Sequence, residues 1–306
     1  MPGRSGVTAR SRPPKDRPIA VRLRPGWRRL VPAAWLEGWN PERFQLDGGW
    51  AEVVATGQGP PLVLLPPLPG YKEAWIACTP RLAREFRVIT FDLRNRFRGP
   101  PSWEPLLQDV RRILEAYAPG AAGVAGHSLG GALAQRWAVA HPERVAALVL
   151  SSTFARVTNP RGNRLARFVE QPLVLASQRL LPDALARPIA RKLAARAAWV
   201  YDRRCDDRVL DLVRFCIRDL GIGSALRAVQ LAIAHDTRAT IHGLRPPTRI
   251  VVGELESVFS REAIAELRRL LPEADFAASP GASHLHPLSN PEWLADTIAE
   301  WMRGRV

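Results

Sequence analysis

The sequence predicts an α/β protein in which helices cover both faces of a mostly parallel sheet. Short, continuous apolar runs occupy residues 62–65 and 145–150, which is the pattern of strands buried on both faces, and residues 86–91 (Phe-Arg-Val-Ile-Thr-Phe) predict a further strand. Segments with apolar residues at helical spacing lie between these runs, most clearly over residues 106–117. Strands that alternate with helices in this way pair in parallel, because each crossover returns the chain to the same end of the sheet.

The first elements precede the parallel strands. Residues 30–39 predict a short helix, and residues 44–46 and 50–55 predict two strands joined by a tight turn at Asp47-Gly48-Gly49. After the strand at 62–65, residues 75–85 predict a helix. The next strand, 86–91, ends at Asp92. The helix that follows turns five apolar side chains toward a sheet: Leu106, Val110, Ile113, Leu114 and Tyr117.

The second half repeats the alternation and then interrupts it. Residues 121–127 predict a strand of small residues, and residues 130–141 predict a helix. From about residue 155 to 241 the chain reads as helical, and the alternation returns with a strand at 248–252. Ser260 is a candidate N-cap for the next helix, residues 274–278 predict a strand, and Asn290 with Pro291 begins a last helix. We therefore expect a core of residues 31–154 and 242–306, interrupted by a helical cap at 155–241.

Charge is concentrated at the N-terminus. The net charge is +15, and residues 1–30 carry nine Arg or Lys against Asp16 alone. With Pro13, Pro14, Pro18 and Pro25 interleaved, this stretch predicts a disordered basic arm that could contact an anionic surface through charge. It contains no recognised nucleic-acid-binding motif, so nucleic acid is not an expected partner. Only three of the 44 basic residues are lysines, an arginine bias that a GC-rich coding sequence also produces.

Length and composition narrow the class of protein. A chain of 306 residues can bury one large core, and 46% apolar with 24% charged residues is typical of soluble globular proteins. We see no apolar run of membrane-spanning length and no secretory signal pattern. The three cysteines are odd in number and predict free thiols in a reducing compartment. These features together predict a cytoplasmic protein.

The central motif is Gly126-His127-Ser128-Leu129-Gly130, which matches G-x-S-x-G. A nucleophile elbow needs a strand before the serine and a helix after it, with glycines where the tight turn leaves no room for side chains. The predicted strand at 121–127 and helix at 130–141 supply that context. Ser128 is therefore the candidate nucleophile, the alternative being a glycine-rich turn with an incidental serine.

The candidate base comes from the loop between the last strand and the last helix. A serine hydroxyl is a weak nucleophile until a base removes its proton. Of six histidines, His284 follows the strand end on the side where the elbow lies, and His286 is the second choice. His127 belongs to the elbow itself and is expected to point away from the serine hydroxyl.

The candidate acid follows the strand at 248–252. Glu254 and Glu256 both lie directly after it, and the chain order serine, acid, histidine is the order of this kind of triad. Glu256 is favoured by its distance from the strand end, with Glu254 as the alternative. Either residue could instead be a solvated loop carboxylate.

Taken together, these segments resemble the α/β-hydrolase superfamily of lid-bearing esterases. The resemblance covers about residues 43–301 and is strongest at 62–75, 86–94, 126–131, 141–150, 249–256 and 281–293. It implies an eight-stranded, mostly parallel sheet, with the insertion at 155–241 as a helical cap over the site.

The chain also departs from this family's usual pattern. Pro66-Pro67 stands where His-Gly is common, and proline has no N–H to donate. The backbone N–H groups of Leu68 and Leu129 could still form an oxyanion hole. The Asp-x-Arg-Gly-x-Gly turn has lost its glycines at residues 92–97, and Glu256 replaces the more usual Asp. These departures indicate a divergent branch.

The function expected from the sequence is a serine hydrolase. Ser128, His284 and Glu256 would cleave an ester, thioester or related acyl bond of a small hydrophobic substrate, without a metal or organic cofactor. Two alternatives stay open. The same fold supports C–C bond hydrolysis and acyl transfer, and a degenerate hydrolase could act as a binding protein.

Overall fold

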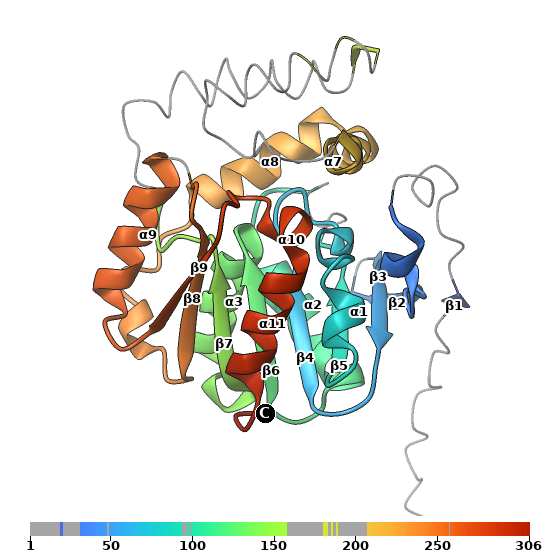
Figure 1. Ribbon diagram of the computed structural model, residues 1–306. Helices are drawn as coiled ribbons and strands as arrows, with labels where there is room; N and C mark the ends of the chain where they lie inside the picture. Colours follow the sequence, from blue (N-terminus) through green and yellow to red (C-terminus); the bar gives the residue numbers. More distant parts are fainter. Residues whose placement is uncertain are drawn as a thin grey trace, which may run out of the picture.

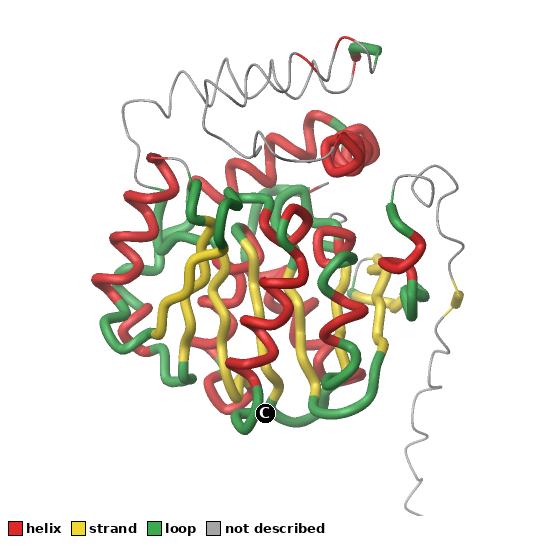
Figure 2. The backbone as a smooth tube through the Cα atoms, viewed as in Figure 1, coloured by secondary structure: helices red, strands yellow, loops and turns green. Residues whose placement is uncertain are grey.

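The computed structural model describes residues 19–20, 31–47, 49–93, 97, 99–157, 180–182, 185, 188, 207–256 and 258–306. These residues form one twisted sheet with helices on both sides (Figures 1 and 2). The strand order is β1-β2-β3-β5-β4-β6-β7-β8-β9. The strands are β1 (Ile19–Ala20), β2 (Glu42–Leu46), β3 (Gly49–Thr56), β4 (Pro61–Leu65), β5 (Arg87–Phe91), β6 (Ala122–His127), β7 (Val145–Ser151), β8 (Thr248–Gly253) and β9 (Asp275–Ser279).

The sheet is parallel from β5 to β9 and antiparallel at the other edge, where β1, β2, β3 and β5 pair in succession. The predicted α/β class and mostly parallel sheet are confirmed. Apart from the two-residue β1, the described strands are the eight that the resemblance implied. Of the predicted arm at 1–30, the structure describes only Ile19 and Ala20, which pair with β2. The disorder of the arm and its contact with an anionic surface stay predictions.

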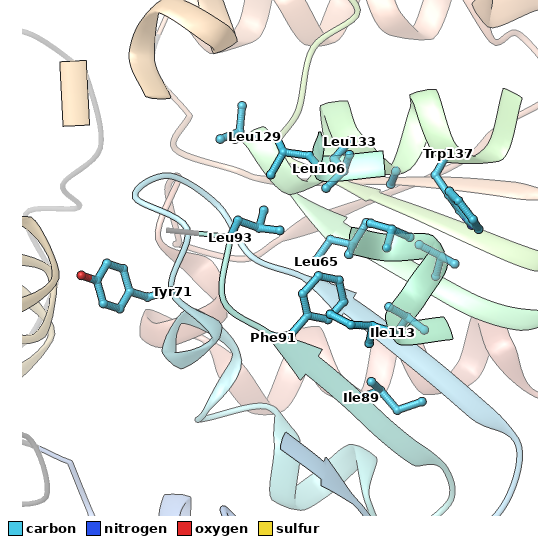
Figure 3. Packing of buried hydrophobic residues seen from close by; sticks show 14 of the residues in the cluster. Leu65, Tyr71, Ile89, Phe91, Leu93, Leu106, Ile113, Leu129, Leu133 and Trp137 are labelled. Carbon is cyan, nitrogen blue, oxygen red and sulfur yellow. The ribbon is translucent and has the colours of Figure 1, made fainter. Parts of the chain in front are cut away.

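Two buried clusters lie against the sheet. One contains side chains of α2 (Glu104–Tyr117), α3 (Leu129–Ala140) and α9 (Val258–Leu270). The other contains side chains of α11 (Pro291–Met302) and α1 (Thr79–Leu82). Strand β4 contributes to both, since Val63 and Leu65 belong to the first cluster and Leu62 and Leu64 to the second. This alternation explains why the strand reads as continuously apolar. Figure 3 shows part of the first cluster.

Several predicted helix limits are wrong. The helix expected over 75–85 is two short turns, η2 (Lys72–Trp75) and α1. The helix at 30–39 is reduced to η1 (Ala33–Leu36). Helix α9 begins at Val258, so Ser260 lies inside the helix and not at the N-cap position. Asn290 does precede α11, but its side-chain amide donates to Ser279 Oγ at 3.1 Å, and it makes no capping bond.

The inserted segment (residues 155–241) lies between β7 and β8. Its described helices are α7 (Asp207–Leu220) and α8 (Ile222–Ile233), followed by η6 (Ile241–Gly243). Figure 1 places α7 and α8 beyond the end of the sheet at which the parallel strands finish. The two connections of the segment run side by side, since the Thr237 N–H donates to the Ala155 carbonyl at 2.9 Å. Most of residues 158–206, which belong to the predicted cap, lie outside the described residues.

Two further expectations concern the environment of the chain. None of the described helices is both long and apolar enough to cross a membrane. Cys78 is a free, buried thiol and Cys216 is also buried, whereas Cys205 lies outside the described residues.

Candidate active site

Ser128 occupies a strained turn between β6 and α3. Its φ and ψ are 53° and −115°, a left-handed conformation that costs a non-glycine residue about 1–3 kcal/mol. Hydrogen bonds from β7 and from the residues that directly follow it hold this turn in place. The Ser128 N–H donates to the Ser151 carbonyl at 2.9 Å, and the Ser128 carbonyl accepts from Thr153 Oγ1 at 2.8 Å. The geometry is that of a nucleophile elbow, as the motif predicts.

The elbow leaves no room for side chains at its glycines. A Cβ at Gly126 would lie 2.4 Å from the Gly130 carbonyl oxygen, and a Cβ at Gly130 would lie 2.1 Å from the Leu65 carbonyl oxygen. Both distances are far inside van der Waals contact. The second contact also brings the beginning of α3 directly against the end of β4, where the loop with Leu68 starts.

The loops after β8 and β9 are joined to each other. The Leu255 N–H donates to the Ala282 carbonyl at 2.8 Å, and the Glu254 N–H donates to the Ser279 carbonyl at 3.0 Å. This pairing brings the two predicted site loops together and places Glu256 Oε1 3.2 Å from His284 Nδ1. His284 in turn lies next to the elbow, with its ring centroid 5.0 Å from that of His127.

The two candidate acids have different surroundings. Glu254 is exposed, and its Oε2 accepts the Gly281 N–H at 2.7 Å, which fixes the loop. Glu256 is 2% exposed and contacts His284. The geometry therefore favours Glu256 as the partner of the imidazole.

The two candidate bases also differ. His286 is fully buried, and its Nε2 lies 2.8 Å from Ser151 Oγ and 3.3 Å from Ser152 Oγ. Burial lowers the pKa of His286 to about 3, so this imidazole is neutral near pH 7. The His284 side chain retains 17% exposure. No hydrogen bond joins the Ser128 hydroxyl to His284 among the described side chains; such catalytic contacts often form fully only with substrate bound.

Two polar side chains next to the site, Ser151 and Ser152, were not predicted from the sequence. Ser151 Oγ bridges His286 Nε2 and His127 Nδ1, at 2.8 Å and 2.9 Å. Ser152, at φ 40°, follows directly, and its Oγ lies 3.3 Å from His286 Nε2. The signal was present, because both serines follow the buried run 145–150 and parallel strands finish at the same edge of a sheet.

The pKa of Glu256 is lowered to about 2. Burial alone would raise it, but the charge of His284, its hydrogen bond to the carboxylate and the nearby Ser152 hydroxyl lower it further than burial raises it. Glu256 is consequently ionised at any pH at which the protein would be assayed. A buried carboxylate in that state can orient the imidazole and stabilise its charged form.

We expect Glu256→Gln to lower kcat/KM by about 10⁴-fold, the typical loss when the acid of such a triad becomes an amide. Glu254→Gln is the matched control and should stay within a few-fold of wild type. Because folding lowers the pKa of Glu256, its ionised form stabilises the fold above its ordinary pKa of 4.5, and this contribution is lost as the pH falls toward 2. Denaturant titrations should therefore show a weaker pH dependence over that window in Glu256→Gln. Equal losses of activity in the two variants would remove the acid role from Glu256.

The predicted oxyanion donors lie on neighbouring segments. Leu129 is the first residue of α3. The first N–H groups of a helix have no acceptor inside the helix, and they form its partially positive end. Leu68 lies in the loop after β4, in a turn closed by the Gly70 N–H on the Pro67 carbonyl at 2.7 Å. Within the described ranges, no three His, Cys, Asp or Glu side chains are grouped so as to hold a metal ion.

Comparison with known proteins agrees with this architecture. The sequence model of the alpha/beta hydrolase fold family matches residues 60–291. The chain is similar to a pimeloyl-[acyl-carrier protein] methyl ester esterase of Klebsiella pneumoniae, with 30% identity over 74% of this chain and 87% of the relative. It is also 28% identical to a dihydrolipoyllysine-residue acetyltransferase component of the acetoin cleaving system of Pseudomonas putida, over 87% of this chain and 70% of that protein. Among solved structures, a thermophilic esterase from Thermogutta terrifontis superposes with a TM-score of 0.68 and 24% identity, covering 85% of this chain and 98% of that one. The chain belongs to the α/β-hydrolase family.

Proposed function

We propose that this protein is a serine esterase in which Ser128 attacks the substrate carbonyl, His284 transfers the proton and Glu256 orients the imidazole. The observation that carries the proposal is the 3.2 Å contact between His284 Nδ1 and Glu256 Oε1, beside the strained turn at Ser128. Membership of a family with relatives named as esterases supports the same activity.

Acylation follows from this arrangement. Ser128 Oγ bonds to the carbonyl carbon while its proton passes to His284 Nε2, since Nδ1 faces Glu256. The carbonyl oxygen becomes negative and accepts hydrogen bonds from the N–H groups of Leu68 and Leu129. The bond to the leaving oxygen then breaks, and the alkoxide takes the proton from His284. An alcohol departs and the acyl group stays on Ser128.

Deacylation repeats the sequence with water. His284 removes a proton from a water molecule, whose oxygen bonds to the acyl carbon. The tetrahedral intermediate collapses, the bond to Ser128 Oγ breaks, and the serine recovers its proton from His284. A carboxylic acid is released.

The inserted segment is the proposed cap over this site. Its helices α7 and α8 lie beyond the end of the sheet that carries Ser128, His284 and Glu256 (Figure 1). Apolar side chains of these helices are buried against the core, among them Leu212, Cys216 and Leu231. A site covered by such helices suits a small hydrophobic acyl group.

The named relatives suggest a narrower substrate to test. The Klebsiella pneumoniae protein is named for the methyl ester of an acyl chain held on a carrier protein. A methyl ester at the far end of a dicarboxylic acyl chain is therefore a candidate substrate of this chain as well. Acyl transfer is the second candidate function, favoured by the likeness to the Pseudomonas putida acetyltransferase component.

A substrate panel tests the proposal. It contains p-nitrophenyl esters from acetate to laurate and dimethyl pimelate, each assayed with and without an alcohol or thiol acceptor. We expect hydrolysis to the free acid, with a preference among acyl lengths that reports the size of the acyl pocket. Acyl product that appears on the added acceptor instead of water would indicate a transferase. A folded protein that turns over none of these esters would contradict the esterase assignment.

A further inference from the structure

We infer that Tyr71 and Asp219 form a positioning contact through which the inserted segment fixes the loop that carries the oxyanion donor at Leu68. The inference rests on the proposed function, because the donor matters only if a carbonyl is attacked at Ser128. It assigns a role to a side-chain pair that does not touch the reacting atoms.

The contact joins two parts of the fold that are distant in sequence. Tyr71 lies three residues after Leu68, in the loop that follows β4, and Asp219 lies in the last turn of α7. The Tyr71 hydroxyl donates to Asp219 Oδ2 at 2.5 Å, and Tyr71 is only 4% exposed. Hydrogen bonds from a hydroxyl to a carboxylate are short and about twice as strong as neutral ones. Figure 3 shows the Tyr71 ring standing apart from the other labelled core side chains.

The loop is anchored to the sheet independently of this contact. The Leu93 N–H donates to the Gly70 carbonyl at 2.8 Å, and the Lys72 N–H donates to Asp92 Oδ1 at 3.1 Å. Lys72 is fully buried, and its ammonium contacts Glu52 at 2.8 Å and Glu73 at 2.6 Å. Residues 70–72 are therefore fixed on the sheet side. Removing the Tyr71 hydroxyl should leave this anchor intact and release the loop on the side of α7.

A second polar contact between the inserted segment and the core supplies a matched control. Arg227 of α8 donates through Nε to the Phe97 carbonyl at 2.7 Å. Phe97 follows β5 and lies outside the loop with Leu68. Both contacts link the inserted segment to the core, but only the Tyr71 contact reaches the loop with the proposed donor. Loss of either contact would therefore loosen the inserted segment in general. Only loss of the Tyr71 contact would also displace the oxyanion donor.

The kinetic signature follows from when the donor acts. An oxyanion hole stabilises charge that exists only in the transition state, so a displaced donor lowers kcat and kcat/KM together and leaves KM nearly unchanged. Complete loss of one donor costs about 10²–10³-fold in kcat. A donor that is still present but displaced should cost less, on the order of tenfold.

The experiment measures kcat and KM on a p-nitrophenyl ester for wild type, Tyr71→Phe, Asp219→Ala, the double variant, Arg227→Gln and Ser128→Ala. We expect about a tenfold fall in kcat at constant KM in Tyr71→Phe and in Asp219→Ala. The double variant should fall no further than the more damaged single variant, because each change removes the hydrogen bond between Tyr71 and Asp219. Arg227→Gln should keep kcat within about twofold of wild type. Thermal unfolding of each variant checks that it is folded, and Asp219→Ala tests the contact if Tyr71→Phe does not fold.

Three results would overturn the inference. One is an unchanged kcat in both single variants while Ser128→Ala is inactive. Another is an equal loss in Arg227→Gln, which would mean that the inserted segment as a whole had loosened. The third is activity that survives Ser128→Ala; this would refute the proposed function itself and leave no oxyanion donor for Tyr71 to position.

Discussion

Ser128→Ala will lower kcat/KM for ester substrates by about a millionfold, the usual cost of deleting the nucleophile of such a triad. The fold should be retained. The Ser128 N–H donates to the Ser151 carbonyl and the Ser128 carbonyl accepts from the Ala132 N–H, and alanine preserves both backbone bonds. The remaining activity would come from substrate binding and the oxyanion donors alone. Initial rates on p-nitrophenyl esters, with thermal unfolding as the folding check, measure the effect.

The control for Ser128→Ala is Ser151→Ala, because Ser151 and His286 form a second serine–histidine pair. Ser151 Oγ lies 2.8 Å from His286 Nε2 and superficially resembles a nucleophile with its base. Both residues are fully buried, and the pKa of His286, about 3, makes it a poor base near neutral pH. Ser151→Ala should therefore lose stability, because the imidazoles of His127 and His286 lose a partner, and should keep most of its activity per folded molecule. A millionfold loss in Ser151→Ala with an active Ser128→Ala would reverse the assignment.

His284→Ala should be as damaging as Ser128→Ala, about a millionfold in kcat/KM, because the nucleophile and the base act as one unit. The double variant Ser128→Ala with His284→Ala should lose no more than either single one. His286→Ala is the comparison, since it removes the other histidine of the same loop. Its expected defect is in stability, through a cavity in the fully buried position.

The pH dependence of unfolding provides a further test of His286. Folding lowers the pKa of His286 from 6.5 to about 3, so the unfolded chain binds the proton more readily. Stability from the neutral, buried imidazole is present above pH 6.5 and is lost as the pH falls toward 3. Replacing His286 with alanine should weaken this dependence. If His286→Ala, and not His284→Ala, abolished turnover in folded protein, the base would be His286.

Local patterns in the sequence were sufficient for the sheet and the elbow. The run at 62–65 is apolar because its side chains alternate between two buried clusters, and periodicity reports that directly. The glycines around Ser128 are required by contacts of 2.1–2.4 Å that a Cβ would make. Such short-range constraints leave a clear pattern in the residues themselves.

The selection among candidates depended on tertiary contacts. Glu254 and Glu256 follow the same strand, and in the sequence only the distance from the strand end favours Glu256. The pairing of their loop with residues 279–282 is what directs Glu256 toward His284. His286 was a credible base until its burial and its contacts with Ser151 and Ser152 were known. Ser152 and Tyr71 belong to no motif, because their partners are far away in the chain. Helix boundaries were also predicted imprecisely. Ser260 has the chemistry of an N-cap residue, but the helix begins before it, at Val258.

Covalent labelling tests the central claim most directly. Folded wild-type protein is treated with a fluorophosphonate, its intact mass is measured, and the modified residue is located by peptide mass spectrometry. The proposed mechanism predicts a single adduct on Ser128 that is absent from Ser128→Ala and slowed strongly in His284→Ala. Label on another serine, such as Ser151 or Ser152, or no label on folded protein, would contradict Ser128 as the nucleophile.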